Sequence, residues 1–351
     1  MSEGEERPST RGQPITTARA RGILALAEAV TASKPEDLDR HVAALLAVAP
    51  EVAPALESFC STDPEAALRL AGGTSLFWQD AGLVDEGRRV VELALASAGP
   101  AATVAGARAT LTASDLAFRQ GDQPTAIRRA TEAIALAAQV GDQRTSSIGH
   151  ANLARVAFRD GDATEIERHA RRALEVAGDD FMGRRGALHM LAWAAHTAGD
   201  LPEARRRFET SLAFRRTLGD RFSVAVELSN LGDLSAEEGD LAAGAEQLAE
   251  ALRVGHELGS RYLIVNLLPS FAALAARTGD DASAVRLLGA AAEAAHSSGL
   301  IADPGSFASG TEAGLRERID PADFARMLDD GRTLTREEAV ELALNVAGAI
   351  A

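Results

Sequence analysis

The chain has 351 residues and a net charge of −15, with 51 acidic and 36 basic side chains, so its own field opposes binding to nucleic acid. We therefore expect no direct nucleic acid binding. Apolar residues make up 46% of the chain and aromatic residues only 4%, which favours closely packed helices with cores of Ala and Leu. Because no long apolar run occurs and Cys60 is the only cysteine, we expect a cytoplasmic protein without membrane contact.

The ends of the chain differ from its middle. Residues 1–13 are polar and contain Pro and Gly, so we expect a disordered tail. Residues 14–64 are expected to form N-terminal capping helices, with two amphipathic segments, ITTARARGILALAEAV and DLDRHVAALLAVA. Residues 301–351 are expected to form a loop and C-terminal capping helices, with a capping box of Thr335 and Glu338. Such caps would cover the apolar faces that the first and last repeats of a solenoid otherwise expose.

Two series of glycines divide residues 65–300 into segments of helical length. The first series, mostly Gly-Asp pairs, recurs every 38 to 40 residues at Gly82, Gly121, Gly161, Gly199, Gly239 and Gly279. The second follows at Gly99, Gly141, Gly178, Gly219, Gly259 and Gly299. Glycine adopts the left-handed conformation that ends a helix, and a following aspartate can cap the next helix. Each period therefore predicts a helical hairpin, with about six hairpins in all.

Three positions around each first-series glycine carry small residues, as expected where two helices cross. Seven residues before the glycine these are Ser75, Ser114, Ala154, Ala192, Gly232 and Ala272. Five residues after it they are Gly87, Ala126, Ile166, Ala204, Gly244 and Ala284, of which Ile166 is the one large residue. Twelve residues after it they are Ala94, Ala133, Ala173, Ser211, Ala251 and Ala291. The next position is expected to form a buried apolar stripe: Leu95, Ile134, Leu174, Leu212, Leu252 and Ala292.

This pattern resembles the tetratricopeptide repeat, whose usual period is 34 residues, with helices about one turn longer here. The resemblance covers residues 65–300. It implies an all-α, right-handed superhelical solenoid of about six hairpins with helical caps. The segments SLFWQDAGLVDEGRRVVELALA and AVRLLGAAAEAAHSSG are more specifically similar to the C-terminal repeat region of large bacterial ATP-dependent transcription regulators of the LuxR type.

In that family a helix-turn-helix commonly follows such an ending, whereas this chain ends at Ala351. Its only lysine, Lys34, lies in SKPED and not in a phosphate-binding loop. We therefore expect a sensor or scaffold, in transcription regulation, that lacks both the ATPase and the DNA-binding domain.

The resemblance also implies that the first helix of each hairpin lines a concave groove. The candidate ligand-binding residues, mostly nine, six or three residues before the turn glycine, are Asp115, Phe118, Asn152, Arg155, Phe158, His189, Met190, Trp193, His196, Asn230 and Asp233. The family often uses asparagine here to hold a peptide backbone, because an amide both donates and accepts. The lysines of its usual carboxylate clamp are missing, and Arg155 or Arg108 would have to replace them.

The two tryptophans have different predicted roles. Trp78 is expected to lie in the core beneath the N-terminal cap. Trp193 is expected either to face the groove, between His189 and His196, or to pack against a neighbouring repeat.

No catalytic, cofactor or metal-binding motif occurs in the sequence. His189 and His196 are about 10 Å apart along a helix, too far to share one zinc ion. We expect no catalytic residue, cofactor or metal, and we interpret the chain as a non-enzymatic binding module for a peptide, a protein segment or a small-molecule effector. Two alternatives stay open. The first is an enzyme or small-molecule-binding protein with an enclosed pocket, and the second is a passive assembly scaffold.

Overall fold

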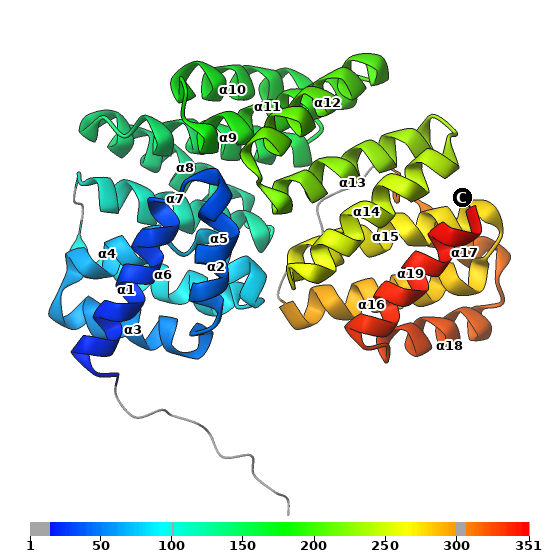
Figure 1. Ribbon diagram of the computed structural model, residues 1–351, viewed down its shortest axis with the longest axis horizontal. Coiled ribbons are helices and arrows are strands. Elements are labelled where there is room, and N and C mark those ends of the chain that lie inside the picture. Colours follow the sequence, from blue (N-terminus) through cyan, green and yellow to red (C-terminus); the bar gives the residue numbers. More distant parts are fainter. Residues whose placement is uncertain (1–14, 100–101, 299–306, 351) are drawn as a thin grey trace, which may run out of the picture.

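The structure, a computed structural model, describes residues 15–99, 102–298 and 307–350, and within these ranges it contains helices and no strand. The predicted all-α fold is confirmed. The helices follow one another around an arch, with the N-terminal helices at one foot, the middle repeats across the top and the C-terminal helices at the other foot (Figure 1). The predicted tail, residues 1–13, lies outside the described residues.

The N-terminal region contains more helices than the two predicted segments. It comprises α1 (Thr17–Thr31), the 3-10 turn η1 (Pro35–Asp37), α2 (Leu38–Leu46), α3 (Ala49–Thr62) and α4 (Pro64–Gly72). The additional helix α3 has Pro50 in its first turn, where proline's missing N–H group costs no helical hydrogen bond.

Six hairpins follow, and five of them consist of two long helices. The hairpins are α5 (Ser75–Ala81) with α6 (Val84–Ala98), α7 (Val104–Arg119) with α8 (Gln123–Val140), α9 (Gln143–Arg159) with α10 (Ala163–Ala177), α11 (Phe181–Thr197) with α12 (Leu201–Leu218), α13 (Arg221–Glu237) with α14 (Leu241–Glu257), and α15 (Arg261–Thr278) with α16 (Asp281–Ser298). In the first hairpin, helix α5 is short because Gly73 and Thr74 separate it from α4.

The glycine turns have the predicted conformation. Gly121 adopts a φ of 76°, and Asp122 caps α8 by accepting a hydrogen bond from the Thr125 N–H at 3.2 Å. The other Gly-Asp turns repeat this arrangement, with capping aspartates Asp162, Asp200, Asp240 and Asp280. Gly299 lies outside the described residues. The dipeptide therefore both ends one helix and begins the next.

The predicted crossing positions are buried, with the sole exception of the half-buried Ser75. Two helix backbones approach closely at Gly232 and Gly244, where a Cβ added to Gly244 would lie 2.9 Å from the Gly232 carbonyl oxygen. The predicted stripe is only partly correct. Leu212 and Leu252 are buried, Leu95, Ile134 and Leu174 are half-buried, and Ala292 is exposed. This position is rotated by about 100° from the crossing and therefore lies at the flank of the helix contact.

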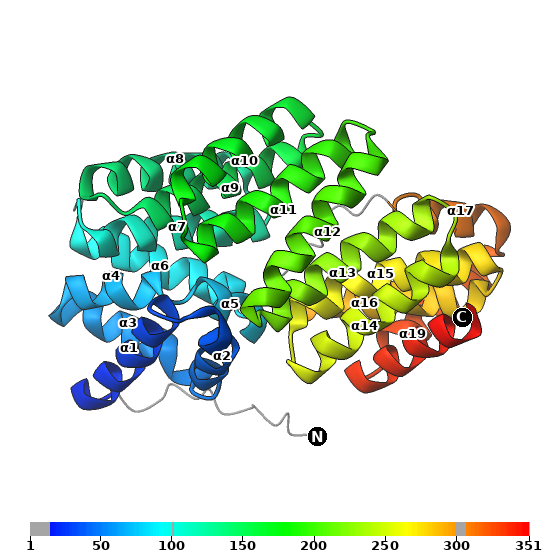
Figure 2. The same ribbon diagram turned by 45° about the horizontal axis from the view of Figure 1, so that its top comes forward.

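Three further helices, α17 (Thr311–Arg318), α18 (Pro321–Arg332) and α19 (Arg336–Ile350), cover the last hairpin, as Figure 2 shows. Helix α18 crosses α16 and α19 packs on α14, α15 and α16. The predicted capping box is confirmed, because Glu338 Oε2 accepts a hydrogen bond from the Thr335 N–H at 2.8 Å and Thr335 Oγ1 accepts one from the Glu338 N–H at 3.2 Å. These helices close the C-terminal end of the core.

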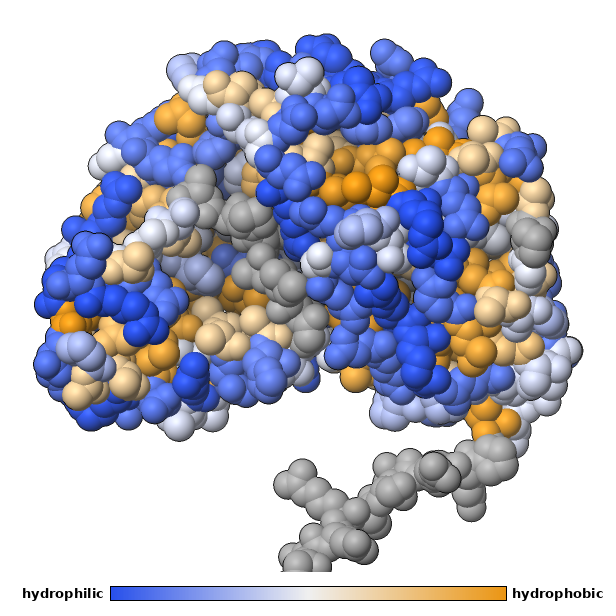
Figure 3. Space-filling model, turned by 180° about the vertical axis from the view of Figure 1, so that it is seen from behind, coloured by the Kyte–Doolittle hydropathy of each residue, from blue (hydrophilic) through white to orange (hydrophobic). Residues whose placement is uncertain are grey.

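The two halves of the arch also touch across the groove. Helix α5 contacts α15, and the Ser260 hydroxyl donates a hydrogen bond to Asp80 Oδ1 at 3.0 Å. The Arg119 guanidinium of α7 stacks on the Tyr262 ring of α15, 4.5 Å from its centroid. Seen from behind, the arch has a largely hydrophilic surface with a notch between its two feet (Figure 3).

Among the described residues, no single helix is both long and apolar enough to cross a membrane. One pair of helical segments, 35–46 and 49–62, meets the length and composition criteria jointly, but it is bent by 83°.

Candidate functional site

A cavity of about 290 Å³ lies on the concave side of the arch. Its wall is formed by the first helices of successive hairpins, α5, α7, α9, α11, α13 and α15, with residues from α1, α2 and α12. The lining is mixed, with six arginines, several aromatic rings and a number of uncharged polar groups. The cavity is therefore a hollow of the superhelical groove whose chemistry is neither purely apolar nor purely charged.

Nine of the eleven candidate residues line this cavity, and Phe118 and His196 do not: Asp115, Asn152, Arg155, Phe158, His189, Met190, Trp193, Asn230 and Asp233. These nine come from α7, α9, α11 and α13, so the repeat brings equivalent positions of four helices together. Their role in binding remains a prediction.

Phe118 and His196 lie beside the cavity wall for different reasons. Phe118 is 2% exposed, and the Arg159 guanidinium covers its ring at 3.7 Å from the centroid. His196 Nε2 lies 2.9 Å from Glu237 Oε2, while its ring packs edge-on against Trp193. Both residues lie three before the turn glycine, on the last turn of their helices, but Phe158 at the equivalent position of α9 does line the cavity.

Trp193 combines the two roles considered for it. The half-buried indole lines the cavity and also packs against Phe158 and Phe208, with ring centroids 4.4 and 5.5 Å away. By contrast, Trp78 is completely buried and its indole N–H donates to Thr74 Oγ1 at 2.9 Å, which confirms the predicted core position. A ligand in the cavity would therefore meet one indole, held rigidly by its neighbours.

A ladder of arginines connects the first helices along one edge of the cavity. Arg108 Nε donates to Asp142 at 2.9 Å, Arg144 Nε to Asp180 at 2.7 Å, and Arg185 Nη1 to Asp220 at 3.0 Å. Each of these aspartates is also the N-cap of the next first helix, accepting from its backbone N–H groups. The ladder therefore fixes the spacing between successive first helices.

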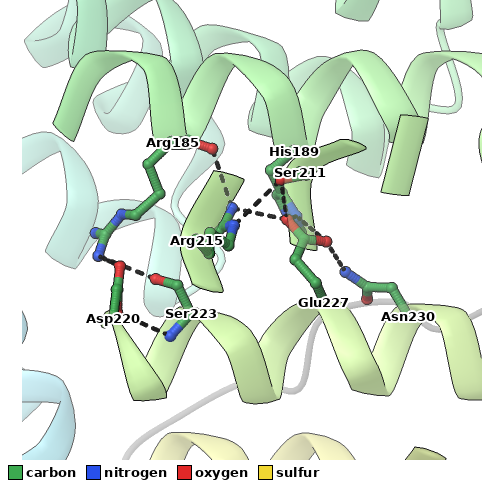
Figure 4. A network of polar contacts seen from close by, with 8 residues as sticks. All are labelled: Arg185, His189, Ser211, Arg215, Asp220, Ser223, Glu227 and Asn230. Atoms are coloured by element: carbon green, nitrogen blue, oxygen red, sulfur yellow. Dashed lines mark hydrogen bonds and ion pairs between the residues drawn. The ribbon is translucent and has the colours of Figure 1, made fainter. Parts of the chain in front are cut away.

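A buried polar network forms the cavity wall at α11, α12 and α13 (Figure 4). Glu227 is fully buried and accepts hydrogen bonds from Ser211 at 2.6 Å and Asn230 at 3.1 Å, while His189 Nδ1 lies 3.1 Å away. Arg215 Nη2 lies 2.8 Å from Glu227 Oε1.

The neighbouring charges keep Glu227 ionised although it is buried. Burial alone would raise the pKa of Glu227, but the charge of Arg215 and the interaction with His189 overcome this effect and hold the pKa at about 2. Burial lowers the pKa of Arg215 from its usual value. The Ser211 hydroxyl donates to Glu227 and not to His189, so the network positions side chains and does not form a nucleophile and base pair.

A second network joins the first hairpins at Asp115. This carboxylate accepts hydrogen bonds from Ser75 at 2.9 Å, Gln79 at 2.6 Å and Arg155 at 3.0 Å. It therefore connects α5, α7 and α9, and its hydrogen-bonding capacity is used within the protein.

Two other cavity residues have polar atoms without partners. Asn152 is 6% exposed, and its amide makes no hydrogen bond with any residue that the structure describes. The Oδ1 atom of Asp233 is buried and likewise accepts no hydrogen bond within the described ranges. The pKa of Asp233 is raised to about 7, chiefly by burial and also by the charge of Glu237, against a hydrogen bond from Ser270.

Cavity residues near the start of the first helices were not predicted from the sequence. Arg144, Arg185 and Tyr262 all lie there, fourteen to seventeen residues before the turn glycine. Long side chains at the beginning of otherwise Ala-rich helices could have indicated that these residues reach into the groove. The residues of α5, such as Gln79, were missed because the break at Gly73 moves that helix into the cavity.

The comparisons with known proteins agree with the repeat geometry. Residues 145–217 match the tetratricopeptide repeat family. No curated protein matches the sequence. A solved structure of a Rap protein complexed with competence and sporulation factor has a TM-score of 0.59 at 12% identity, covering 94% of this chain and 96% of that one.

Two further solved structures cover less of the chain. BtubC (BKLC) from P. vanneervenii has a TM-score of 0.45 at 17% identity, covering 62% of this chain and 92% of that chain. The tetratricopeptide-like repeats of a putative kinesin light chain from Podosopora anserina have a TM-score of 0.40 at 17% identity, covering 56% of this chain and 98% of that chain. The family match over residues 145–217 and the likeness to the Rap structure show that the chain has a tetratricopeptide-like solenoid fold.

Proposed function

We propose that the chain is a non-enzymatic binding module whose concave cavity accepts a short peptide or protein segment in a regulatory or sensing role. The observation that carries this proposal is the Asn152 amide, which is almost completely buried, lines the cavity and makes no hydrogen bond within the described residues. An amide donates and accepts at once, as a peptide backbone does. The amide atoms of Asn152 are not among the polar atoms sealed from solvent without a partner, so a bound backbone can reach them and replace the water there.

The arrangement around Asn152 supports a peptide ligand. Arg155 lies one turn away, and Trp193 of the next hairpin offers an aromatic surface in the same cavity. Binding sites commonly combine a few directed polar groups with aromatic and apolar walls. The Rap protein whose fold resembles this chain was solved in complex with competence and sporulation factor, and the sequence resembles the repeat region of LuxR-type regulators. Both likenesses support a regulatory context.

A small-molecule effector is the second candidate, and the size and partial closure of the cavity favour it. Ligand pockets range from about 300 to 1,000 Å³, and this cavity of about 290 Å³ lies near the lower limit. The contact between α5 and α15 also closes the groove on one side. The experiment must therefore distinguish a peptide from a small molecule.

Native mass spectrometry of the protein purified from its own host tests the proposal, because the mass of a retained ligand identifies its class. A peptide mass supports the proposed function, a small-molecule mass supports the second candidate, and reproducible absence of ligand together with failure to bind peptide libraries contradicts both. With the recovered ligand, Trp193→Ala should weaken binding roughly thirtyfold, because central aromatic anchors contribute about 2 kcal/mol or more. Phe214→Ala is the matched control, since Phe214 packs against Arg184 outside the cavity.

A further inference from the structure

Asp233 differs from the other charged residues of the cavity because it makes no ion pair with any residue that the structure describes. Each arginine in the lining has a carboxylate within ion-pair distance, as in the pairs Arg155 with Asp115, Arg185 with Asp220 and Arg215 with Glu227. Asp115, the other lining aspartate, is paired in this way. Among the described residues, none places a cation within 4 Å of the Asp233 carboxylate.

The surroundings of Asp233 suit a positively charged group. Asp233 and Trp193 occupy equivalent positions, six residues before their turn glycines, on the neighbouring first helices α13 and α11, and both line the cavity. Asn230 lies one turn before Asp233 in the same wall, with its amide nitrogen directed to Glu227. A carboxylate and an aromatic ring that line one cavity from neighbouring helices are the groups that bind ammonium and guanidinium ions, through ion pairing and cation–π attraction.

We propose that Asp233 and Trp193 form a subsite for a protonated amine or guanidinium of the bound peptide. This inference rests on the proposed peptide-binding function. The cation is either the free N-terminus of the peptide or a Lys or Arg side chain, and both sources have the same chemistry. A ligand cation here provides the positive partner that Asp233 does not find among the described residues. The subsite therefore selects positively charged peptides, although the cavity contains six arginines.

Binding at this subsite depends on pH. The pKa of the free Asp233 carboxyl is raised to about 7, chiefly by burial and also by the charge of Glu237 on the same helix, while the Ser270 hydroxyl on α15 and His196 on α11 oppose the shift. A cation binds the ionised carboxylate and therefore releases a proton from it. For a Lys or Arg side chain the affinity should rise with pH until about pH 7, and well below that value it should fall about tenfold per pH unit. For a free N-terminus, which loses its own proton at about pH 8, the affinity should also fall above that pH.

The test uses three tetrapeptide libraries and the full-length protein. The first library has a free N-terminus and no Lys or Arg, the second is N-acetylated and carries one Lys or Arg, and the third is N-acetylated and has no cation. Affinity selection and mass spectrometry at about pH 8 identify the retained peptides, and calorimetry at about pH 8 and about pH 6 measures their affinities and the release of protons. The first two libraries distinguish the N-terminus from a side chain as the source of the cation.

The wild-type protein should retain peptides from the first or second library, and Asp233→Asn should weaken them at least tenfold and abolish the pH dependence. Glu238→Gln is the control, because Glu238 pairs with Arg205 outside the cavity and its loss should leave the affinities unchanged. Urea unfolding verifies that both variants are folded.

Equal retention of the third library, or unchanged affinities in Asp233→Asn, overturns the cation subsite and leaves the peptide-binding function intact. An affinity that increases as the pH falls overturns it as well, because a protonated Asp233 would then be the binding form. Retention of no peptide from any library rejects both the subsite and the peptide-binding function.

Discussion

Arg215 on α12 and Glu227 on α13 lie 2.8 Å apart, and neither side chain is more than 5% exposed. Arg215 lines the cavity, while Glu227 lies behind the lining, with His189, Ser211 and Asn230 bound to its carboxylate. Two charges buried at this depth are compensated chiefly by each other and by their hydrogen bonds, with smaller contributions from Asp220 and His189. The shape of the cavity at α13 therefore depends on both residues being present.

Replacing Glu227 by Gln should destabilise the protein by about 3–5 kcal/mol, because it leaves the buried charge of Arg215 without compensation. Urea unfolding at neutral pH measures the effect. The matched control is Glu250→Gln, which removes an exposed pair with Arg216 and should cost no more than about 1 kcal/mol. Equal effects of the two substitutions would contradict the assigned role of the pair.

The same pair predicts an acid-sensitive contribution to stability. The folded-state pKa of Glu227 is about 2, below its ordinary value of 4.5, because the Arg215 charge and His189 outweigh the effect of burial. A carboxyl group whose pKa is lowered by folding stabilises the folded state at pH values above its ordinary pKa. This contribution is lost as the pH falls from about 4.5 towards 2. The stability difference between wild type and Glu227→Gln should therefore shrink across that window in denaturant titrations.

Enlarging a small residue at a helix crossing should also destabilise the solenoid. Ala133 on α8 and Ala154 on α9 are completely buried, so replacing either by Leu should cost about 1–3 kcal/mol through overpacking. The control Ala135→Leu changes an exposed position of α8 and should leave the melting temperature nearly unchanged. Thermal unfolding of the three variants compares them directly, and indistinguishable melting temperatures would refute the packing described for the crossings.

The C-terminal cap depends on a glycine contact between α16 and α18. A Cβ at Gly331 would lie 2.1 Å from the Arg286 carbonyl oxygen, so Gly331→Ala should force the helices apart and cost about 1–3 kcal/mol or more. At Gly348 of α19 the added Cβ meets no atom within 4 Å, and Gly348→Ala should stabilise the helix by about 0.5–1 kcal/mol. Opposite shifts in chemical unfolding are the expected result.

Asp80 gives a prediction of the opposite sign to that for Glu227. Burial raises the pKa of Asp80 to about 6, against the hydrogen bond from Ser260 and the charge of Arg119. A carboxyl group whose pKa is raised by folding stabilises the folded state at pH values below its ordinary pKa of 3.8. This contribution is lost as the pH rises through 6. Asp80→Asn keeps an acceptor for Ser260, so above about pH 7 it should be more stable than wild type, by ~1–3 kcal/mol. Equal stability at about pH 8 would contradict the buried state of this carboxyl.

The sequence allows the repeat to be predicted because its signals are local. Gly121 must end one helix and Asp122 can cap the next, whatever the remainder of the chain does. The crossing positions follow from the same register. The number of N-terminal helices was less predictable, because α3 begins with a proline and lies outside the repeat.

The cavity was predictable only in part, because its shape depends on small rotations that accumulate between repeats. Asn152 and Asn230 could be placed from their register, and both line the cavity. Tyr262 also lines the cavity, from the start of α15, whereas Ser270, the residue equivalent to these asparagines, is buried and does not line it. Which of the equivalent positions reaches the cavity therefore differs between hairpins, and the register alone does not reveal it.

The hydrogen bond from Ser260 to Asp80 joins residues 180 positions apart in the sequence. In an ordinary linear repeat array each unit contacts only its neighbours, so terminal units can fray and partial unfolding can spread inwards. Here the first and last hairpins restrain each other, and neither can detach without breaking a contact with the far end of the array. The arch should consequently unfold as one cooperative unit, and it should resist extension because its first and last hairpins are joined.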